Sequence, residues 1–246
     1  MLPPRSPRPA HPDPLATMQR RRILVTLVAL LPIVTVGAQQ THDIAPYLMP
    51  NVGQEIALAR TAAPSRISDS ATVLVLTRAR FITAAHGTNG FTCVVLRSFS
   101  GTVGNPEYWN PRVRAPHCFN APASRTVLPE ILQEAEWVLA GVSPTETETR
   151  SRRRYAAHQI PAPATGAMTY MLSKEQYLQD ANPHAAPHLM FYYDKAMPAS
   201  IWGAVGGMAP VIDDAEGDAH ANILTLFVPT RSWSDGSPAS SAASRK

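Results

Sequence analysis

The stretch "ATVLVLTRARFITAAHGTNGFTCVVLRSF", residues 71–99, decides the fold. Its β-branched and apolar runs are interrupted near Arg78 and again at Asn89-Gly90. An Asn-Gly pair between two β runs is typical of a hairpin turn, because both residues tolerate positive φ. We therefore expect three antiparallel strands at 72–77, 80–86 and 90–97. They form a meander in which "FITAAHG" (81–87) belongs to the middle strand.

The segment "FITAAHG" resembles the strand that carries the catalytic histidine of trypsin-like serine proteases. Such an enzyme also needs a nucleophile and an oxyanion hole, which that family supplies with a Gly-Asp-Ser-Gly-Gly motif. The nearest glycine cluster, which starts at Gly203, contains no serine, and Gly87 replaces the cysteine that normally follows the histidine. We therefore interpret His86 as a histidine of the sheet rather than as a catalytic base.

The remainder of the chain alternates between helical and strand patterns. Helical periodicity and capping residues predict helices over 51–63, 124–142 and 143–157 and a short helix over 173–180. Apolar runs predict strands at 166–172, 187–194 and 222–229. Together these elements predict an α+β domain, in which a mainly antiparallel sheet, the three-stranded N-terminal meander plus the later strands, carries helices packed on one face.

The N-terminus has the pattern of a secretory signal peptide. Met18 is followed by three arginines, an apolar run over 23–36 and small residues before Ala38. We expect translation to start at Met18 and cleavage to follow Ala38, so that 1–38 is an N-terminal extension and signal peptide, 39–235 a single globular domain and 236–246 a disordered tail. The apolar run is shorter than the roughly 20 residues that span a bilayer, so no stable transmembrane anchor is expected after cleavage. The expected location is therefore periplasmic or extracellular.

The charge of the chain bears on the class of partner, and its cysteine content predicts a disulfide. The full chain carries a net charge of +4, but residues 1–38 contain five arginines and one acidic residue, so the remaining chain has equal numbers of acidic and basic residues. A formally neutral protein lacks the basic surface that nucleic acid requires, so no nucleic-acid partner is expected. The two cysteines, Cys93 and Cys118, lie in a chain expected in an oxidising compartment, which predicts a disulfide between them.

Two histidines are candidate metal ligands. His184 and His188 have the i, i+4 spacing that zinc sites use. Pro183 and Pro187 each precede a histidine and disfavour a helix there, and the glutamate of a His-Glu-x-x-His motif is absent. We therefore expect no cofactor, and zinc at His184 and His188 is the alternative.

Several segments resemble an uncharacterised group of secreted bacterial proteins. They are "NGFTC" (89–93), "PEYWNPRVRAPHCFN" (106–120), "GAMTYML" (166–172), "PHLMFYY" (187–193) and "WSDG" (233–236), and the likeness covers most of the chain after residue 38. The resemblance implies an exported bacterial protein. It places a candidate site around Asn110, Arg112, Tyr170 and His188.

These observations favour a non-catalytic binding or envelope-associated module, whose partner is a small ligand or an envelope protein. The alternative is a hydrolase or metal-dependent enzyme that uses His188 with the 106–120 loop. Convergence of His188, Arg112 and Asn110 in one concave, partly apolar pocket would favour the enzyme. Their dispersal would favour the binding module.

Overall fold

A computed structural model of the chain describes residues 42–181, 183–194, 211–213 and 223–239. The chain divides into two units, Met1–Gly37 and Ala38–Lys246, and all described residues belong to the second. The predicted signal peptide and its cleavage site lie outside the described residues. Within the described part of the chain, no helix has both the length and the apolar content needed to cross a membrane.

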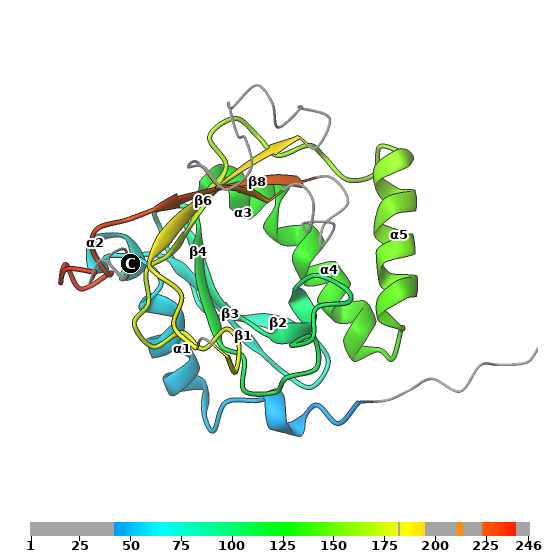
Figure 1. Ribbon diagram of the computed structural model, residues 1–246, viewed down its shortest axis with the longest axis horizontal. Helices are drawn as coiled ribbons and strands as arrows, with labels where there is room; N and C mark the ends of the chain where they lie inside the picture. The colour runs from blue at the N-terminus through cyan, green and yellow to red at the C-terminus, as the bar shows by residue number, and fades with distance from the viewer. Residues whose placement is uncertain (1–41, 182, 195–210, 214–222, 240–246) are drawn as a thin grey trace, which may run out of the picture. The chain divides into compact units, whose positions relative to one another are not determined.

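Among the described residues, the fold is α+β, as the sequence predicts (Figure 1). These residues form an eight-stranded, mostly antiparallel sheet with the order β2-β1-β3-β4-β5-β6-β8-β7. The strands are β1 (Thr72–Leu76), β2 (Phe81–Ala85), β3 (Thr92–Leu96), β4 (Ala115–Phe119), β5 (Met168–Met171), β6 (His188–Asp194), β7 (Val211–Asp213) and β8 (Ile223–Pro229). The helices are α1 (Val52–Arg60), α2 (Ser65–Ser68), α3 (Ala121–Thr126), α4 (Leu128–Leu139) and α5 (Pro144–Ala156), with 3-10 turns at Ala45–Tyr47 and Ser98–Ser100.

The predicted N-terminal meander is wrong, although its three strands exist. β1 pairs with β2 in antiparallel fashion and with β3 in parallel, so β1 is the middle strand and "FITAA" is the sheet edge. After β2 the chain crosses the start of β1, and Thr88 N donates to the Ser70 carbonyl over 2.9 Å. A Cβ on Gly87 would lie 2.2 Å from Thr72 N, so the crossing requires glycine at this position. Asn89-Gly90 thus ends a crossover instead of forming a hairpin.

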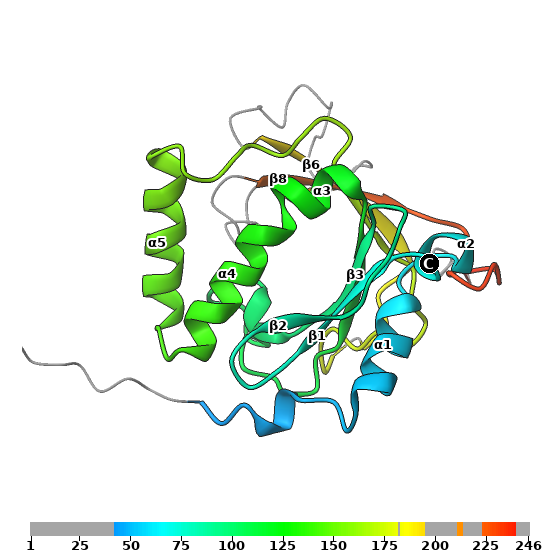
Figure 2. The ribbon, with the colours of Figure 1, turned by 180° about the vertical axis from the view of Figure 1, so that it is seen from behind.

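Helices pack on both faces of the sheet, which corrects the prediction of helices on one face. Leu58 and Ala59 of α1 pack against one face, where they meet a cluster that includes Val73 and Val95. On the opposite face, α3 and α4 cover an apolar cluster that includes Val94, Phe119, Ile131 and Ala135. Figures 1 and 2 show α1 on one side of the β1 and β3 strands and α4 on the other, with α5 beyond α4. The face opposite α1 is called the α4 face below.

Local capping explains where the helices begin. The Asn51 side chain accepts a hydrogen bond from Gln54 N, and the Ser143 side chain accepts one from Glu146 N. The predicted helix over 124–142 is divided in two at Val127, where α3 ends and α4 begins. Gly141 adopts a φ of 84° just after α4, the left-handed conformation that commonly terminates a helix.

The predicted helix over 173–180 is absent, because tertiary contacts take its hydrogen-bonding groups. Tyr177 forms an isolated antiparallel bridge with Arg114, with N–O distances of 2.8 and 2.9 Å. The Ser173 hydroxyl accepts from Glu175 N, two residues on, and Gln176 donates to the Ala185 carbonyl rather than capping a helix. The segment is therefore extended and lies beside the start of β4.

The region predicted as a disordered tail begins with ordered residues. Ala239 N donates to the Arg231 carbonyl over 2.8 Å, and Ser232 forms a bridge with Pro238, so residues 236–239 complete a turn. Residues 240–246 lie outside the described residues.

The predicted disulfide is confirmed. Cys93 of β3 and Cys118 of β4 are direct cross-strand partners, bonded to each other, and both are fully buried on the α1 face. A disulfide is compatible with an exported protein, because such bonds persist in oxidising compartments.

Candidate ligand-binding site

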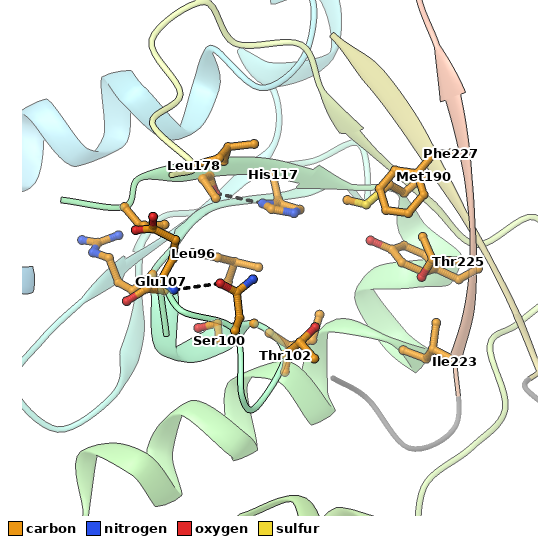
Figure 3. A pocket seen from close by; sticks show the side chains of 18 residues that line it. Leu96, Ser100, Thr102, Glu107, His117, Leu178, Met190, Ile223, Thr225 and Phe227 are labelled. Carbon is orange, nitrogen blue, oxygen red and sulfur yellow. Dashed lines mark hydrogen bonds between the residues drawn. The ribbon is translucent and has the colours of Figure 1, made fainter. Parts of the chain in front are cut away.

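A cavity of about 280 Å³ lies on the α4 face of the sheet. The loop between β3 and β4 closes one side of it, and strands β4, β6 and β8 form the opposite walls. Figure 3 shows Glu107 and Leu178 across the cavity from Ile223 and Thr225. The lining residues are Leu96, Arg97, Ser98, Ser100, Gly101, Thr102, Asn105, Glu107, Val113, Ala115, His117, Ile131, Leu178, Met190, Tyr192, Ile223, Thr225 and Phe227.

Strand register determines which side chains reach the cavity. Met190 is the partner of Phe227, and Tyr192 is the partner of Thr225. Directly opposed residues in an antiparallel pair point to the same face, and alternate residues along each strand share that face. Met190 and Tyr192 therefore line the cavity together with their partners on β8, whereas Tyr193 points to the other face.

The loop before β4 is held in place by polar contacts around Glu107. The Glu107 carboxylate accepts from Asp180 N over 3.1 Å and from Asn110 Nδ2 over 2.5 Å, and Asn105 Oδ1 accepts from Glu107 N. A long connection inside a compact domain usually needs such anchoring or serves a function. Here the anchoring holds the backbone of residues 100–107 along the cavity rim.

The Ser98 and Ser100 hydroxyls, which line the cavity, are buried without hydrogen-bond partners among the described residues, and the Tyr192 phenol lines the same cavity. Ser100 is 6% exposed, and Tyr192 is 7% exposed. Burial raises the pKa of Tyr192 well above its ordinary value of 10.0, because the phenolate would lose its hydration. The phenol is therefore neutral and retains its proton at physiological pH.

His117 contributes an imidazole to the same cavity. Its Nδ1 donates to the Ala115 carbonyl over 2.8 Å, since a carbonyl oxygen can only accept. The ring stacks with Phe119 at a centroid distance of 5.7 Å. These contacts orient the imidazole on the central strand of the cavity wall, where Figure 3 places it between Leu178 and Met190.

Two of the sequence-predicted site residues, Asn110 and Arg112, lie together outside the cavity. Asn110 Nδ2 donates to Asp180 Oδ1 over 2.8 Å, and Arg112 Nη1 lies 3.4 Å from the same oxygen. The Arg112 guanidinium also lies over the Tyr177 ring, 4.5 Å from its centroid. Hydrogen bonds from Tyr177 and Asn110 lower the pKa of Asp180. This exposed network joins the loop before β4 to the segment after β5.

The other two sequence-predicted residues, Tyr170 and His188, lie apart from that network and from each other. Tyr170 is on the α1 face, where its ring is 6.3 Å from that of Phe91. His188 is on the α4 face at the start of β6; its Nδ1 donates to the Ala186 carbonyl, and its ring centroid is 5.4 Å from that of Phe227. Burial lowers the pKa of His188. The four candidates therefore do not converge on one pocket.

The sequence prediction missed the cavity residues, although the residue pattern of two strands gives a partial indication of them. The alternation in "HLMFYYD" (188–194) and "ILTLFVP" (223–229) is visible in the sequence, and it identifies two sets of alternate side chains on each strand. It does not say which set faces a helix, a cavity or solvent. Ser100 ends the short 3-10 turn Ser98–Ser100 and Glu107 lies in an irregular loop, and neither segment is long enough to show a periodic pattern in the sequence.

The zinc alternative can be compared with the described geometry. Among the described residues, no group of three or more His, Cys, Asp or Glu side chains is placed to hold a metal ion. His184 is exposed in the segment before β6.

The chain matches no protein-family model, no curated protein and no solved structure.

Proposed function

We propose that this protein binds a small, largely apolar molecule in the cavity on the α4 face. The observation that carries the proposal is the Ser100 hydroxyl, which lines the cavity and is buried without a described partner. Tyr192, a buried residue, presents its phenol to the same cavity. Buried polar groups in proteins are nearly always hydrogen-bonded, because an unpaired one costs about 1–3 kcal/mol. A bound molecule with a hydrogen-bonding group would give the Ser100 hydroxyl the partner that it lacks among the described residues.

The composition of the cavity supports the same function. Leu96, Ile131, Met190, Ile223 and Phe227 give it apolar walls, and a small number of polar groups lie among them. Ligand pockets typically have this composition, because apolar walls provide affinity and a few polar groups determine orientation.

The dispersal of the predicted catalytic residues favours binding over hydrolysis. A hydrolase at this site would bring His188 together with Arg112 and Asn110, whereas Arg112 and Asn110 are engaged in the exposed network with Asp180. The proposal includes export to the periplasm or the cell exterior in a bacterium. The disulfide and the resemblance to secreted bacterial proteins support that location.

Butylbenzene is a suitable first ligand, because it has no polar group and therefore tests only whether the cavity binds an apolar molecule. The protein, labelled with ¹³C at its methionine methyl groups, is titrated and observed by NMR. We expect the Met190 methyl signal to shift and the shift to reach a plateau as butylbenzene is added. Met168 of β5 points to the α1 face, away from the cavity, so its methyl signal should not shift. A Met190 signal that shifts neither with butylbenzene nor with a polar derivative of the same skeleton contradicts the proposal.

A cavity-filling variant provides the second measurement. Leu178→Trp places a larger side chain in the cavity and should abolish the shift at Met190. The control is Ile82→Trp, which adds the same indole at an exposed position of β2 and should leave the titration unchanged. Equal binding by Leu178→Trp and the parent protein would place the butylbenzene elsewhere.

A further inference from the structure

We infer that the ligand is an uncharged molecule whose apolar body carries a hydrogen-bond acceptor, such as a carbonyl oxygen. The inference rests on the proposed function, because it concerns the chemistry of the same cavity. It comes from the charged groups at the cavity wall, from the hydroxyl groups of Tyr192 and Ser100, and from the cavity volume.

Among the described residues that line the cavity, no lysine or arginine side chain is available to an anion. Arg97 lines it, but its guanidinium points away and binds Glu55, the Tyr47 carbonyl and the Val95 carbonyl. The Glu107 carboxylate is at the cavity rim, where it repels a negative charge. An anionic ligand would therefore lose its hydration without gaining an ion pair with a lysine or arginine.

A cationic ligand would also bind weakly in this cavity. The carboxylate of Glu107 already accepts hydrogen bonds from Asp180 N and Asn110 Nδ2. The opposite wall, formed by Ile223, Thr225 and Phe227, carries no charged side chain among the described residues. An ammonium group there would lose most of its hydration for one shared carboxylate.

The hydroxyl groups of Tyr192 and Ser100 favour a ligand that carries a hydrogen-bond acceptor. Tyr192 stays protonated, so its O–H is available as a donor, and the Ser100 hydroxyl can rotate to donate. A carbonyl oxygen has two lone pairs and suits either donor. A purely apolar ligand would offer neither hydroxyl a partner, at a cost in affinity.

The volume limits the size of the ligand. An engineered cavity of about 150 Å³ holds one benzene molecule, so a cavity of about 280 Å³ holds a molecule of roughly ten to twelve non-hydrogen atoms. A phenyl ring with a four-carbon chain has this size.

Four probes with the same skeleton test the inference: butylbenzene, 4-phenylbutan-2-one, 4-phenylbutanoate and 4-phenylbutylammonium. Their dissociation constants are measured at pH 7 by the Met190 NMR titration. We expect the ketone to bind at least about tenfold more tightly than the carboxylate or the ammonium compound, because desolvating a charge costs more than desolvating a carbonyl.

Two variants identify the hydrogen bond. In Tyr192→Phe and in Ser100→Ala, the ratio of ketone affinity to butylbenzene affinity should fall, by about tenfold for the hydroxyl that makes the main contact. Butylbenzene is more hydrophobic than the ketone, but this difference affects the parent protein and the variants equally. It therefore cancels when their affinity ratios are compared. Tyr193→Phe, which removes a hydroxyl from the opposite face of β6, should keep the parental ratio. Ser100→Ala is an independent test should Tyr192→Phe fail to fold.

The outcomes separate the two proposals. If none of the four probes shifts Met190, the proposed binding function itself is wrong. If butylbenzene binds but neither variant changes the affinity ratio, the function stands and the acceptor inference is wrong. Tightest binding of the carboxylate or of the ammonium compound likewise overturns the inference of an uncharged ligand.

Discussion

Arg97 and Glu55 form an ion pair in the interior of the protein. Arg97 Nη2 lies 2.7 Å from Glu55 Oε1, and the two side chains are 0% and 3% exposed. Arg97 Nε also donates to the Tyr47 carbonyl, and Glu55 Oε1 accepts from Leu76 N. The pair thus joins α1, the end of β1, the segment after β3 and the first 3-10 turn. It also draws the Arg97 guanidinium away from the cavity.

Breaking this pair should be strongly destabilising, because the remaining partner is left charged in the interior. We expect Arg97→Met to lower the free energy of unfolding by about 3–5 kcal/mol in urea denaturation, and Glu55→Gln to have an effect in the same range. Lys174→Met is the control, since Lys174 and Asp235 form an exposed pair, 47% and 54% exposed, which solvent screens, so little or no loss of unfolding free energy is expected. Equal urea midpoints for Arg97→Met and the control would show that the buried pair contributes little.

The crossover at Gly87 predicts a large difference between two glycine substitutions. In Gly87→Ala the new Cβ would meet the backbone of Ala71 and Thr72 at 2.2 Å, so the start of β1 must move. We expect a loss of more than about 3 kcal/mol in unfolding free energy, as for other strongly overpacked sites. In Gly53→Ala, near the start of α1, the nearest atom is 3.4 Å away, and a gain of roughly 0.5–1 kcal/mol is expected. Two substitutions of equal effect would contradict the crossover geometry.

The Cys93–Cys118 disulfide should stabilise the protein by restricting the unfolded chain. The two cysteines are separated by 25 positions in the sequence, and replacing both by alanine should lower the free energy of unfolding by about 3 kcal/mol. Urea denaturation compares this variant with the oxidised protein. Because both cysteines are fully buried, reductant should act on the native protein slowly and on the urea-unfolded protein quickly. Rapid reduction under native conditions would be inconsistent with the buried position.

His188 should make stability depend on pH. Burial lowers its pKa in the folded state below the ordinary value of 6.5. As the pH falls through 6.5, the unfolded chain binds a proton at His188 before the folded protein does, so the free energy of unfolding decreases. The decrease ends below the pKa of the folded state.

His188→Gln should remove this contribution, so the unfolding free energy of the variant should fall less than that of the parent protein between neutral pH and mildly acidic pH. Urea denaturation over a pH series measures both slopes. His184→Gln is the control, because it retains His188 and should keep the parental slope. Parallel profiles for His188→Gln and the parent protein would show that His188 does not titrate differently on folding.

The sequence by itself determined most of the local elements and the disulfide, but not the segment 173–180, where tertiary contacts replace the predicted helix. Caps at Asn51 and Ser143, apolar runs and the pair Cys93 and Cys118 depend on neighbouring residues or on compartment chemistry, so they can be interpreted without tertiary information. The class, α+β with a mainly antiparallel sheet, follows from the order of those elements.

Strand order, helix placement and the cavity were decided by tertiary structure. "GTNG" (87–90) has the residues of a hairpin turn, yet Gly87 passes over the backbone of Thr72 and brings β3 to the far side of β1. Local sequence cannot distinguish the two outcomes, because both need the same flexible glycines. The cavity needs residues from β4, β6, β8, α4 and the loop before β4. Whether Tyr192 or Tyr193 faces that cavity depends on strand pairing between segments distant in the chain, which only the folded protein specifies.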